Sequence, residues 1–519
     1  MKKLIILAIV IIFASCSDNL EDLNQNIKDP STVLGESLFT SAQKSLVDQM
    51  VDLNVNNNNT KLWVQYLQET TYTDESNYDQ TTRTIPGRHW SILYKDVLKD
   101  LDEAAKVISA TTYNLPEDEA LKPNKLTIIE ILNIYTYSIL VETFGDIPYE
   151  EALDIDNLSP QYDDGLTIYE DLIERLTIAI DNLDTGLGSF GTADRIYNGN
   201  VTKWKKFAAS LKLRMGILLS DVDNTFAQEA VEEAVAAGVF TSNNDNAEYA
   251  YLSADPNTNP IHANLVLSGR QDFVAATTIL DIMQPREYEY LEDTNENGEI
   301  DSDDARTVVP GSVTSTDPRL AYYFDSNVDA DPSVSEIVYF GGEIGQTASY
   351  NSHSHVSERV ESATNPGVIF DYAEVEFLLA EASARSFNVG GTPKEHYDAG
   401  IMASCEYWEV PEGEAADYLT QPHVDYDTAI ASSSAATPWK EVIGTQKYIA
   451  LYNRGFEAWT SIRLLDYPLL ATPADAVSGF PTRYTYPIVE QTLNSSNWEA
   501  ASDAIGGDLA ETKLFFDIF

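Results

Sequence analysis

The chain has 519 residues, of which 43% are hydrophobic, and 83 acidic against 32 basic side chains give it a net charge of −51. A surface this acidic repels phosphates, so nucleic acids and anionic polymers are disfavoured as partners, while neutral or cationic ligands are favoured. The chain is long enough for a large core, and no Gly/Ser-rich or Pro-rich linker divides it.

The first predicted element is an export signal. Two lysines precede an apolar run over 4–13, which is too short to cross a bilayer, because a spanning helix needs about 20 apolar residues. Small residues then lead to Cys16, as in a bacterial lipobox. We predict a signal peptide over 1–15, lipidation of Cys16 and a polar tether over 16–30, which together hold the body at a membrane surface. An ordinary signal peptide with a chance cysteine is the alternative.

The remainder, 31–519, is predicted to be one mainly α-helical domain. Apolar residues recur at helical spacing over 31–53, 89–108, 124–144, 166–183, 201–220, 225–237, 272–283, 371–387, 394–407 and 440–464. Antiparallel pairs of such helices resemble a tetratricopeptide-like scaffold, although no strict repeat is visible. Strand-like runs are few, at 247–252 and 336–340. We expect the loop-rich, aromatic stretch 241–365 to carry binding residues.

Three segments combine aromatic and hydrogen-bonding side chains, the mixture that binds sugar rings: 61–83, then 259–273, where Arg270 and Asp272 could hydrogen-bond hydroxyl groups, and a third wall at Tyr350 and Asn351. In segment 61–83, Trp63 and Tyr66 sit one helical turn apart and belong equally well to a core, whereas Tyr72 and Tyr78 lie in a polar stretch and are predicted to be exposed. The candidate ligand-binding residues are Trp63, Tyr66, Tyr72, Tyr78, Trp90, Arg270, Asp272, Tyr350 and Asn351.

Residues 293–304, DTNENGEIDSDD, have the spacing of a calcium loop. Calcium takes about 6–8 oxygen ligands around a sharp glycine turn, and this loop offers Asp293, Asn295, Asn297, Glu299, Asp301 and Asp304. Asp304 replaces the usual closing Glu, and the flanks are not a clear helix pair. We therefore predict a structural Ca²⁺ loop of the extracellular type rather than a complete EF-hand; an acidic turn without an ion is the alternative.

Catalytic motifs are missing from the sequence. It contains no P-loop, dinucleotide fingerprint or Gly-x-Ser-x-Gly. Glu376 and Glu381 could suggest a glycosidase pair, but nothing places them across a cleft. His353 and His355 could chelate a metal, but a solvated loop pair is the simpler interpretation. We predict no catalytic residues and no enzyme.

Seven phrases, in order along the chain, resemble the SusD/RagB family of nutrient-binding outer-membrane lipoproteins of Bacteroidetes. They are the acidic lead from Cys16 to Pro30, VETFGDIPYEEAL (141–153), DRIYNGNVTKWKKFAASLKLRM (194–215), DPRLAYYF (317–324), DYAEVEFLLAEA (371–382), TQKYIALYNRGFEAWTSIRLLDYP (445–468) and PTRYTYPIVEQTLN (481–494). Most of them are predicted to be architectural. Pro148, for example, cannot continue a helix.

The resemblance implies a lipoprotein of the outer membrane that faces the outside and binds oligosaccharides on an external face built from loops. It also implies a partner, a SusC-type TonB-dependent barrel, on which the protein would act as a lid that delivers its ligand. We expect the ligand to be neutral. Binding of peptides rather than glycans, a purely structural helical-repeat lipoprotein and a secreted hydrolase are the alternatives.

Overall fold

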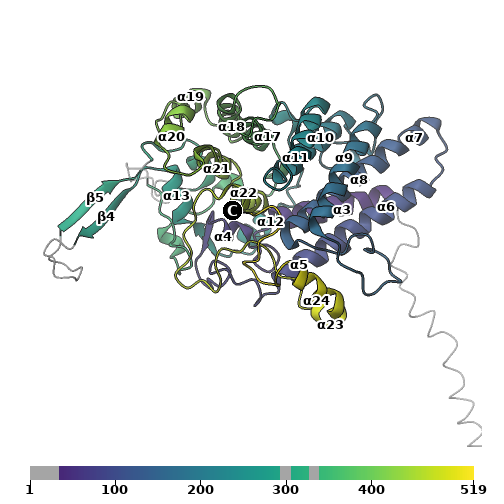
Figure 1. Cartoon of the computed structure of the whole chain (residues 1–519), viewed down its shortest axis with the longest axis horizontal. Coiled ribbons are helices and arrows are strands. Elements are labelled where there is room, and N and C mark those ends of the chain that lie inside the picture. The colour runs from purple at the N-terminus through teal and green to yellow at the C-terminus, as the bar shows by residue number, and fades with distance from the viewer. Residues whose placement is uncertain (1–33, 293–304, 312, 327–337, 519) are drawn as a thin grey trace, which may run out of the picture.

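The computed structural model describes residues 34–292, 305–311, 313–326 and 338–518. The predicted signal peptide, Cys16, the tether and the candidate calcium loop 293–304 lie outside these residues. Within them, the protein is a body of packed helices from which one two-stranded hairpin projects (Figure 1).

The first half of the described chain contains α3 (Gly35–Val51), α4 (Thr60–Trp63), β1 (Leu67–Glu69), α5 (Ile85–Ser91), the π-helix η1 (Ile92–Leu98), α6 (Lys99–Ala110), α7 (Pro116–Ala120), α8 (Lys122–Phe144), α9 (Gly165–Asn182), η2 (Gly191–Ala193), α10 (Val201–Leu218), α11 (Asn224–Ala237), η3 (Asn243–Asp245) and β2 (Ala247–Tyr249). The second half contains α12 (Pro260–His262), the π-helix η4 (Ala263–Leu267), β3 (Phe273–Ala275), α13 (Thr277–Met283), β4 (Glu287–Glu292), β5 (Ala305–Pro310), α14 (Leu320–Tyr323), η5 (Tyr350–Ser352), α16 (Glu358–Glu361), β6 (Gly367–Phe370), α17 (Tyr372–Ala384), α18 (Pro393–Tyr407), α19 (Glu412–Leu419), α20 (Tyr426–Ser432), α21 (Pro438–Ala450), α22 (Gly455–Leu465), α23 (Glu490–Leu493) and α24 (Ser495–Ala504).

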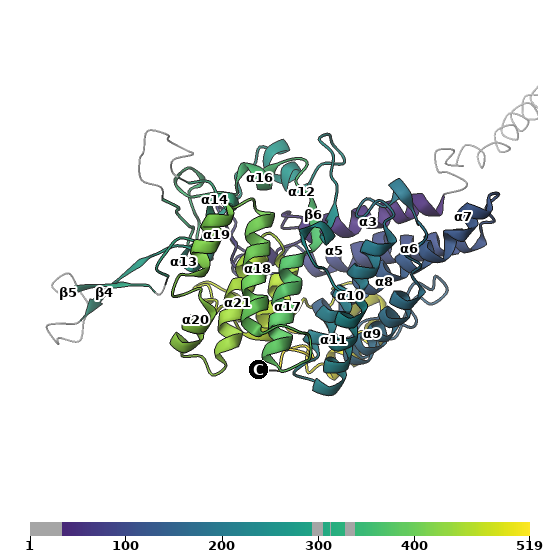
Figure 2. The same cartoon turned by 90° about the horizontal axis from the view of Figure 1, so that it is seen from above.

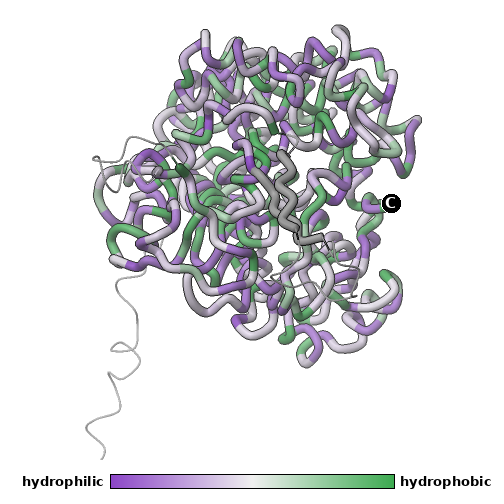
Figure 3. Tube along the Cα trace, turned by 90° about the vertical axis from the view of Figure 1, so that its left-hand side faces the viewer, coloured by the Kyte–Doolittle hydropathy of each residue, from purple (hydrophilic) through white to green (hydrophobic). Residues whose placement is uncertain are grey.

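The helices pack in pairs, and the pairs stack side by side. Helix α8 packs against α9, α10 against α11 and α17 against α18, while α10 also contacts both α9 and α17 (Figure 2). Hydrophobic and hydrophilic stretches alternate along the trace (Figure 3), as expected of amphipathic helices that each bury one stripe. The prediction of a mainly α, tetratricopeptide-like scaffold is confirmed.

Two local predictions need correction. The segment predicted as a helix over 272–283 begins as strand β3 and becomes helical only in α13, because Phe273–Ala275 pairs with β1. In the strand-like run 336–340, the described residues 338–340 form no strand. The run 247–252 does supply β2, which pairs with β6.

One helical stretch among the described residues, Pro116–Phe144, is long and apolar enough to cross a membrane by length and composition, but 78% of its apolar window is buried inside the protein. Its neighbours α6, α9 and α10 cover α8. The stretch is therefore best understood as a core element.

Several of the sequence phrases meet in the core through buried ion pairs. The Arg214 guanidinium donates to both carboxylate oxygens of Glu374 at 2.7 and 2.9 Å, and Arg454 lies 2.5 Å from the same carboxylate. These residues come from 194–215, 371–382 and 445–468. Because the phrases hold one another inside the fold, the prediction that most of them are architectural is confirmed for these three.

The phrases at 141–153 and 481–494 also meet in the core, through hydrogen bonds from an arginine to the backbone. Arg483 donates to the carbonyl oxygen of Phe144 at 2.9 and 3.2 Å and thereby caps the C-terminus of α8. Gly145 follows with φ +85°, a conformation that glycine adopts without strain. The chain then turns into Asp146, which accepts a hydrogen bond from the Gly165 amide at 2.9 Å.

The strands form three small antiparallel sheets, β1–β3, β2–β6 and β4–β5. The β4–β5 pair runs in register from Glu287 opposite Pro310 to Glu292 opposite Ala305, and it is the hairpin that projects from the body (Figure 1). The β1–β3 pair lies at the root of the loops described next.

Candidate functional site

The three segments that the sequence nominated for ligand binding are joined by backbone hydrogen bonds. Glu69 in β1 is paired with Phe273 in β3, and just beyond, the Thr70 amide donates to the Asp272 carbonyl at 2.8 Å. The third segment joins through the Ala348 amide, which donates to the Thr70 carbonyl at 3.1 Å. We call the surface formed by 52–58, 69–84, 260–275 and 340–355 the loop face.

A hollow of about 140 Å³ opens on the loop face. It is lined by Leu53, Asn54, Val55, Asn56, Arg83, Asn264, Arg270, Asp272 and Phe273, and we call it the polar hollow. Pockets that enclose a whole drug-sized ligand measure about 300–1,000 Å³. The polar hollow therefore fits one ring or one substituent of a larger ligand.

The loop after α3 shapes one wall of the polar hollow. One oxygen of the Asp52 carboxylate accepts hydrogen bonds from the amides of Leu53 and Asn54 at 2.8 and 3.0 Å. It also accepts from the Asn264 side chain at 2.7 Å, which ties this loop to the π-helix η4. Beneath the loop, the Lys61 ammonium donates to the carbonyls of Val51 and Asp52 at 2.8 and 3.0 Å; burial lowers the pKa of Lys61 to about 8.

Both arginines of the polar hollow carry a carboxylate partner. Arg270 and Asp272 form an ion pair on the rim, and Arg83 lies 2.5 Å from the Glu75 carboxylate beneath the wall. The opposite charges compensate each other, while guanidinium, amide and carboxylate groups still offer donors and acceptors. Such a lining suits an uncharged molecule with many hydroxyl or amide groups.

The structure separates the four aromatic residues predicted in 61–83. Tyr72 is 72% exposed, which confirms its predicted exposure. Tyr78 is only 1% exposed, so the prediction of its exposure was wrong: its hydroxyl accepts a hydrogen bond from Gln65 at 3.1 Å, and its ring contacts Phe480. Burial raises the pKa of Tyr78 to about 12.

Trp63 and Tyr66 follow the core alternative. Trp63 is fully buried between Trp459 and Tyr484, with ring centroids 5.2 and 5.1 Å away, and the Tyr66 hydroxyl donates to the Tyr448 carbonyl at 2.5 Å. Neither ring reaches the loop face: Trp63 ends the short helix α4, and Tyr66 lies in the bend that precedes β1, where both rings are fully buried. The half-buried Trp90 packs against Phe144, Tyr94 and Tyr162, so its ring also serves internal packing.

Tyr350 and Asn351 lie in η5, in the third segment of the loop face. Asn351 is exposed, and Tyr350 is half-buried with its ring stacked on His355 at 4.2 Å. His353 hydrogen-bonds the Ser349 carbonyl at 2.7 Å. Across the described ranges, no group of three or more His, Cys, Asp or Glu side chains could hold a metal ion.

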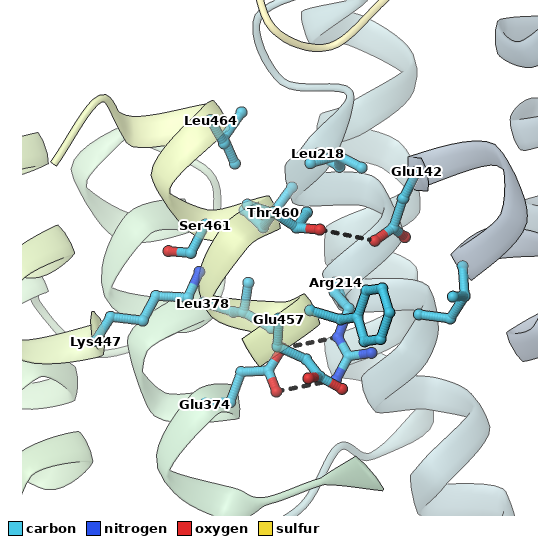
Figure 4. A pocket seen from close by; sticks show the side chains of 13 residues that line it. Glu142, Arg214, Leu218, Glu374, Leu378, Lys447, Glu457, Thr460, Ser461 and Leu464 are labelled. Carbon is cyan, nitrogen blue, oxygen red and sulfur yellow. Dashed lines mark hydrogen bonds and ion pairs between the residues drawn. The ribbon is translucent and has the colours of Figure 1, made fainter. Parts of the chain in front are cut away.

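The glutamates that could have suggested a hydrolase are core residues of α17. Glu381 is fully buried and pairs with Lys447 at 2.6 Å, while Glu376 lies 2.7 Å from the His396 ring. Nearby, Glu142, Arg214, Glu374, Lys447 and Glu457 line an internal cavity of about 30 Å³ (Figure 4). A space of this size holds a water molecule rather than a sugar ring.

Sequence reasoning missed most of the lining of the polar hollow: Leu53, Asn54, Val55, Asn56, Arg83, Asn264 and Phe273. The asparagine-rich run LNVNNNN (53–59) was an available signal, since clustered asparagines are typical of turns with exposed amides. The other lining residues come from distant parts of the chain, and the β1–β3 pairing and the Asn264–Asp52 hydrogen bond bring them together.

The structure combines a stacked-helix body with one polar loop face, an architecture in which a rigid scaffold positions loops. The family comparison is more specific: the SusD-like model described as "Starch-binding associating with outer membrane" matches residues 26–305 and 293–487. The chain belongs to this SusD-like family. By family, it is a carbohydrate-binding protein associated with the outer membrane rather than an enzyme.

Solved structures share the fold. A chitin-binding protein is 24% identical with a TM-score of 0.73, covering 93% of this chain and 100% of its own. A chitin-binding SusD homologue from Flavobacterium johnsoniae is 22% identical with a TM-score of 0.70, covering 93% and 97%. A SusD homologue from Parabacteroides distasonis is 22% identical with a TM-score of 0.73, covering 94% and 98%. No curated protein matches the sequence.

Proposed function

We propose that this protein is the lipid-anchored, outward-facing subunit of a glycan-uptake system. It captures neutral oligosaccharides on the loop face and delivers them to a SusC-type TonB-dependent barrel. The observation that carries the proposal is the convergence of 53–56, Arg83 and 264–273 on the polar hollow, in a chain that belongs to the SusD-like family.

The chemistry of the loop face supports a neutral glycan. The charges of Arg270 and Arg83 are compensated by Asp272 and Glu75, and the protein as a whole carries −51. The asparagine amides of the polar hollow donate to and accept from hydroxyl or acetamido groups, and Val55 and Phe273 add apolar surface. Two structural relatives are described as chitin-binding, which makes oligomers of N-acetylated sugars the first ligands to try.

Calorimetry tests the ligand class. The soluble body should bind a neutral glycan from a panel of chitin and starch oligosaccharides, and its affinity should change little with salt because few charges are neutralised. An acidic glycan and a mixture of peptides complete the panel. Binding that is confined to the acidic glycan or to peptides would contradict the proposed ligand.

Fractionation tests the anchor and the partner. The sequence LAIVIIFASC ends at Cys16, and lipidation there would place the mature chain at the membrane. Cys16→Ala should move the protein to the soluble fraction and abolish labelling by fatty acid. The wild-type chain should co-purify with a TonB-dependent barrel from detergent extracts; membrane retention of the variant, or purification without a barrel, would remove the corresponding part of the proposal.

A further inference from the structure

Two glutamates lie buried at the root of the loop that separates β1 from α5. Glu69 is 3% exposed and Glu75 is 1% exposed. The Glu75 carboxylate is paired with Arg83, whereas the Glu69 carboxyl group accepts hydrogen bonds from the amide and hydroxyl of Ser76 and is paired with no cation among the described residues. A buried carboxylate without a cation partner is costly, and two buried carboxyl groups side by side disfavour double ionisation, so one of them keeps its proton. The pair therefore holds a proton in the folded protein.

The loop 71–84, which includes Glu75, contacts the pair at two points. Near its middle, next to Glu75, the Ser76 amide and hydroxyl donate to one Glu69 oxygen at 3.0 and 2.9 Å. Near its end, Arg83 lies 2.5 Å from Glu75. The Arg83 side chain is still 31% exposed and lines the polar hollow, so one side chain connects the buried pair to the candidate ligand site.

Other charged groups around the pair are already matched or face solvent. From the β3 side, Asp272 is paired with Arg270. Asp74 in the loop and Glu343 in the segment packed beside Gln68 are exposed. Lys61 donates to the carbonyls of Val51 and Asp52 instead, and burial lowers its pKa to about 8.

The loop backbone needs such a clamp. Tyr72, Tyr78 and Thr84 have φ of 57°, 69° and 54°, left-handed conformations that residues other than glycine rarely adopt. Strained conformations of this kind persist only where the surrounding structure holds them. The contacts of Glu69 and Glu75 are part of what holds this loop and the exposed Tyr72 that it carries.

We propose that Glu69 and Glu75 are positioning residues for ligand binding: their shared proton clamps the loop 71–84 and holds Arg83 in the wall of the polar hollow, so that ligand affinity falls when the proton is lost. This inference rests on the proposed function. Burial, reinforced by the neighbouring Glu75 carboxylate, raises the pKa of Glu69 to about 9. At neutral pH the proton is held, and in alkaline solution the two buried negative charges repel each other.

The same proton makes stability depend on pH. Because the pKa of Glu69 is raised from 4.5 to about 9, the folded protein binds more protons than the unfolded chain between these values. Stability must therefore fall as pH rises through that range. In Glu69→Gln, the amide can accept from Ser76 through its oxygen and donate to Glu75 through its nitrogen. Because an amide does not titrate, these contacts should not depend on pH.

Thermal melting from pH 5 to pH 9.5 tests the shared proton without any ligand. The melting temperature of Glu69→Gln should rise relative to wild type as pH increases, while Glu117→Gln, at an exposed position on α7, should follow wild type throughout. Lys61 is present in all three proteins, so the difference between them reports on the pair alone. Parallel curves for Glu69→Gln and wild type would overturn the shared proton.

Calorimetry at pH 7 and pH 9.5, with the glycan that wild type binds, tests the positioning role. Wild type should lose at least tenfold in affinity at the higher pH, and Glu69→Gln should lose much less. Equal losses in both proteins would overturn the positioning role. Absence of glycan binding at either pH would instead count against the proposed function, while melting still decides whether the pair shares a proton. Should Glu69→Gln fold poorly, Glu75→Gln replaces it with the same expectation for melting.

Discussion

The helical core and the loop face both use arginine–carboxylate pairs, but in opposite ways. In the core, Glu374 is 3% exposed and is held by Arg214 and Arg454 from two other helical segments. On the loop face, Arg270 is 64% exposed and pairs with Asp272, two residues away along the chain. The two pairs of Glu374 join distant parts of the sequence, whereas the Arg270–Asp272 pair joins neighbours.

The difference in burial implies a difference in energy. Removing one partner of a buried pair leaves an uncompensated charge and is strongly destabilising. An exposed pair contributes little to stability. Its main consequence is for the charge distribution on the surface. Buried pairs such as those of Glu374 thus stabilise the scaffold, while the exposed Arg270–Asp272 pair of the polar hollow can change with modest consequences for folding.

Among the variants that test this comparison, Glu374→Ala should have the largest effect on the free energy of unfolding. Arg214 and Arg454 would remain buried without their shared carboxylate, and the free energy of unfolding should fall by about 3–5 kcal/mol. Urea unfolding of the soluble body measures it. Asp272→Ala is the matched control from the loop face and should shift unfolding far less; equal losses in the two variants would show that burial does not separate the two regions.

The calcium site predicted at 293–304 should have the second-largest effect on stability. An ion that binds only the folded chain stabilises it by mass action, by about 2.7 kcal/mol at a free concentration one hundred times the Kd. The melting temperature should rise with calcium and fall with a chelator, and Asp293→Ala should remove both responses. Identical melting curves with calcium and with chelator would contradict the calcium hypothesis.

Tyr72→Ala gives the smallest expected effect. An exposed ring that stacks on a sugar contributes about 1 kcal/mol, so the Kd should weaken about fivefold while the melting temperature stays unchanged. Tyr78→Ala is the contrast, because it removes a buried ring from the loop and should lower the melting temperature. If Tyr72→Ala leaves the affinity unchanged, Tyr72 is not part of the site.

The helices could be predicted from the sequence because the spacing of apolar residues alone identifies them. The apolar stripes predicted α8, α10 and α17, and the phrases that carry Arg214, Glu374 and Arg454 indicated the family. Reasoning about the site was less complete, because exposure in a loop depends on long-range contacts. Tyr72 and Tyr78 stand in similar polar surroundings in the sequence, yet only the second is covered, by Gln65 and Phe480.

The polar hollow shows the same limit. Asn56, Arg83 and Arg270 are separated by long stretches of sequence, and no local pattern links them. They converge because β1 pairs with β3 and because Asn264 is hydrogen-bonded to Asp52. Such convergence follows from the tertiary fold rather than from residue type or spacing.

Calorimetry of Asn56→Trp tests the central claim most directly, namely that the polar hollow receives a neutral glycan. Asn56 is exposed and lines the polar hollow, so the indole should fill the space without disturbing the core. With the neutral oligosaccharide that wild type binds, the Kd should weaken at least tenfold at an unchanged melting temperature, and Glu117→Trp on α7 should bind as wild type does. Wild-type affinity in Asn56→Trp would contradict the account, because the ligand would then bind elsewhere on the protein.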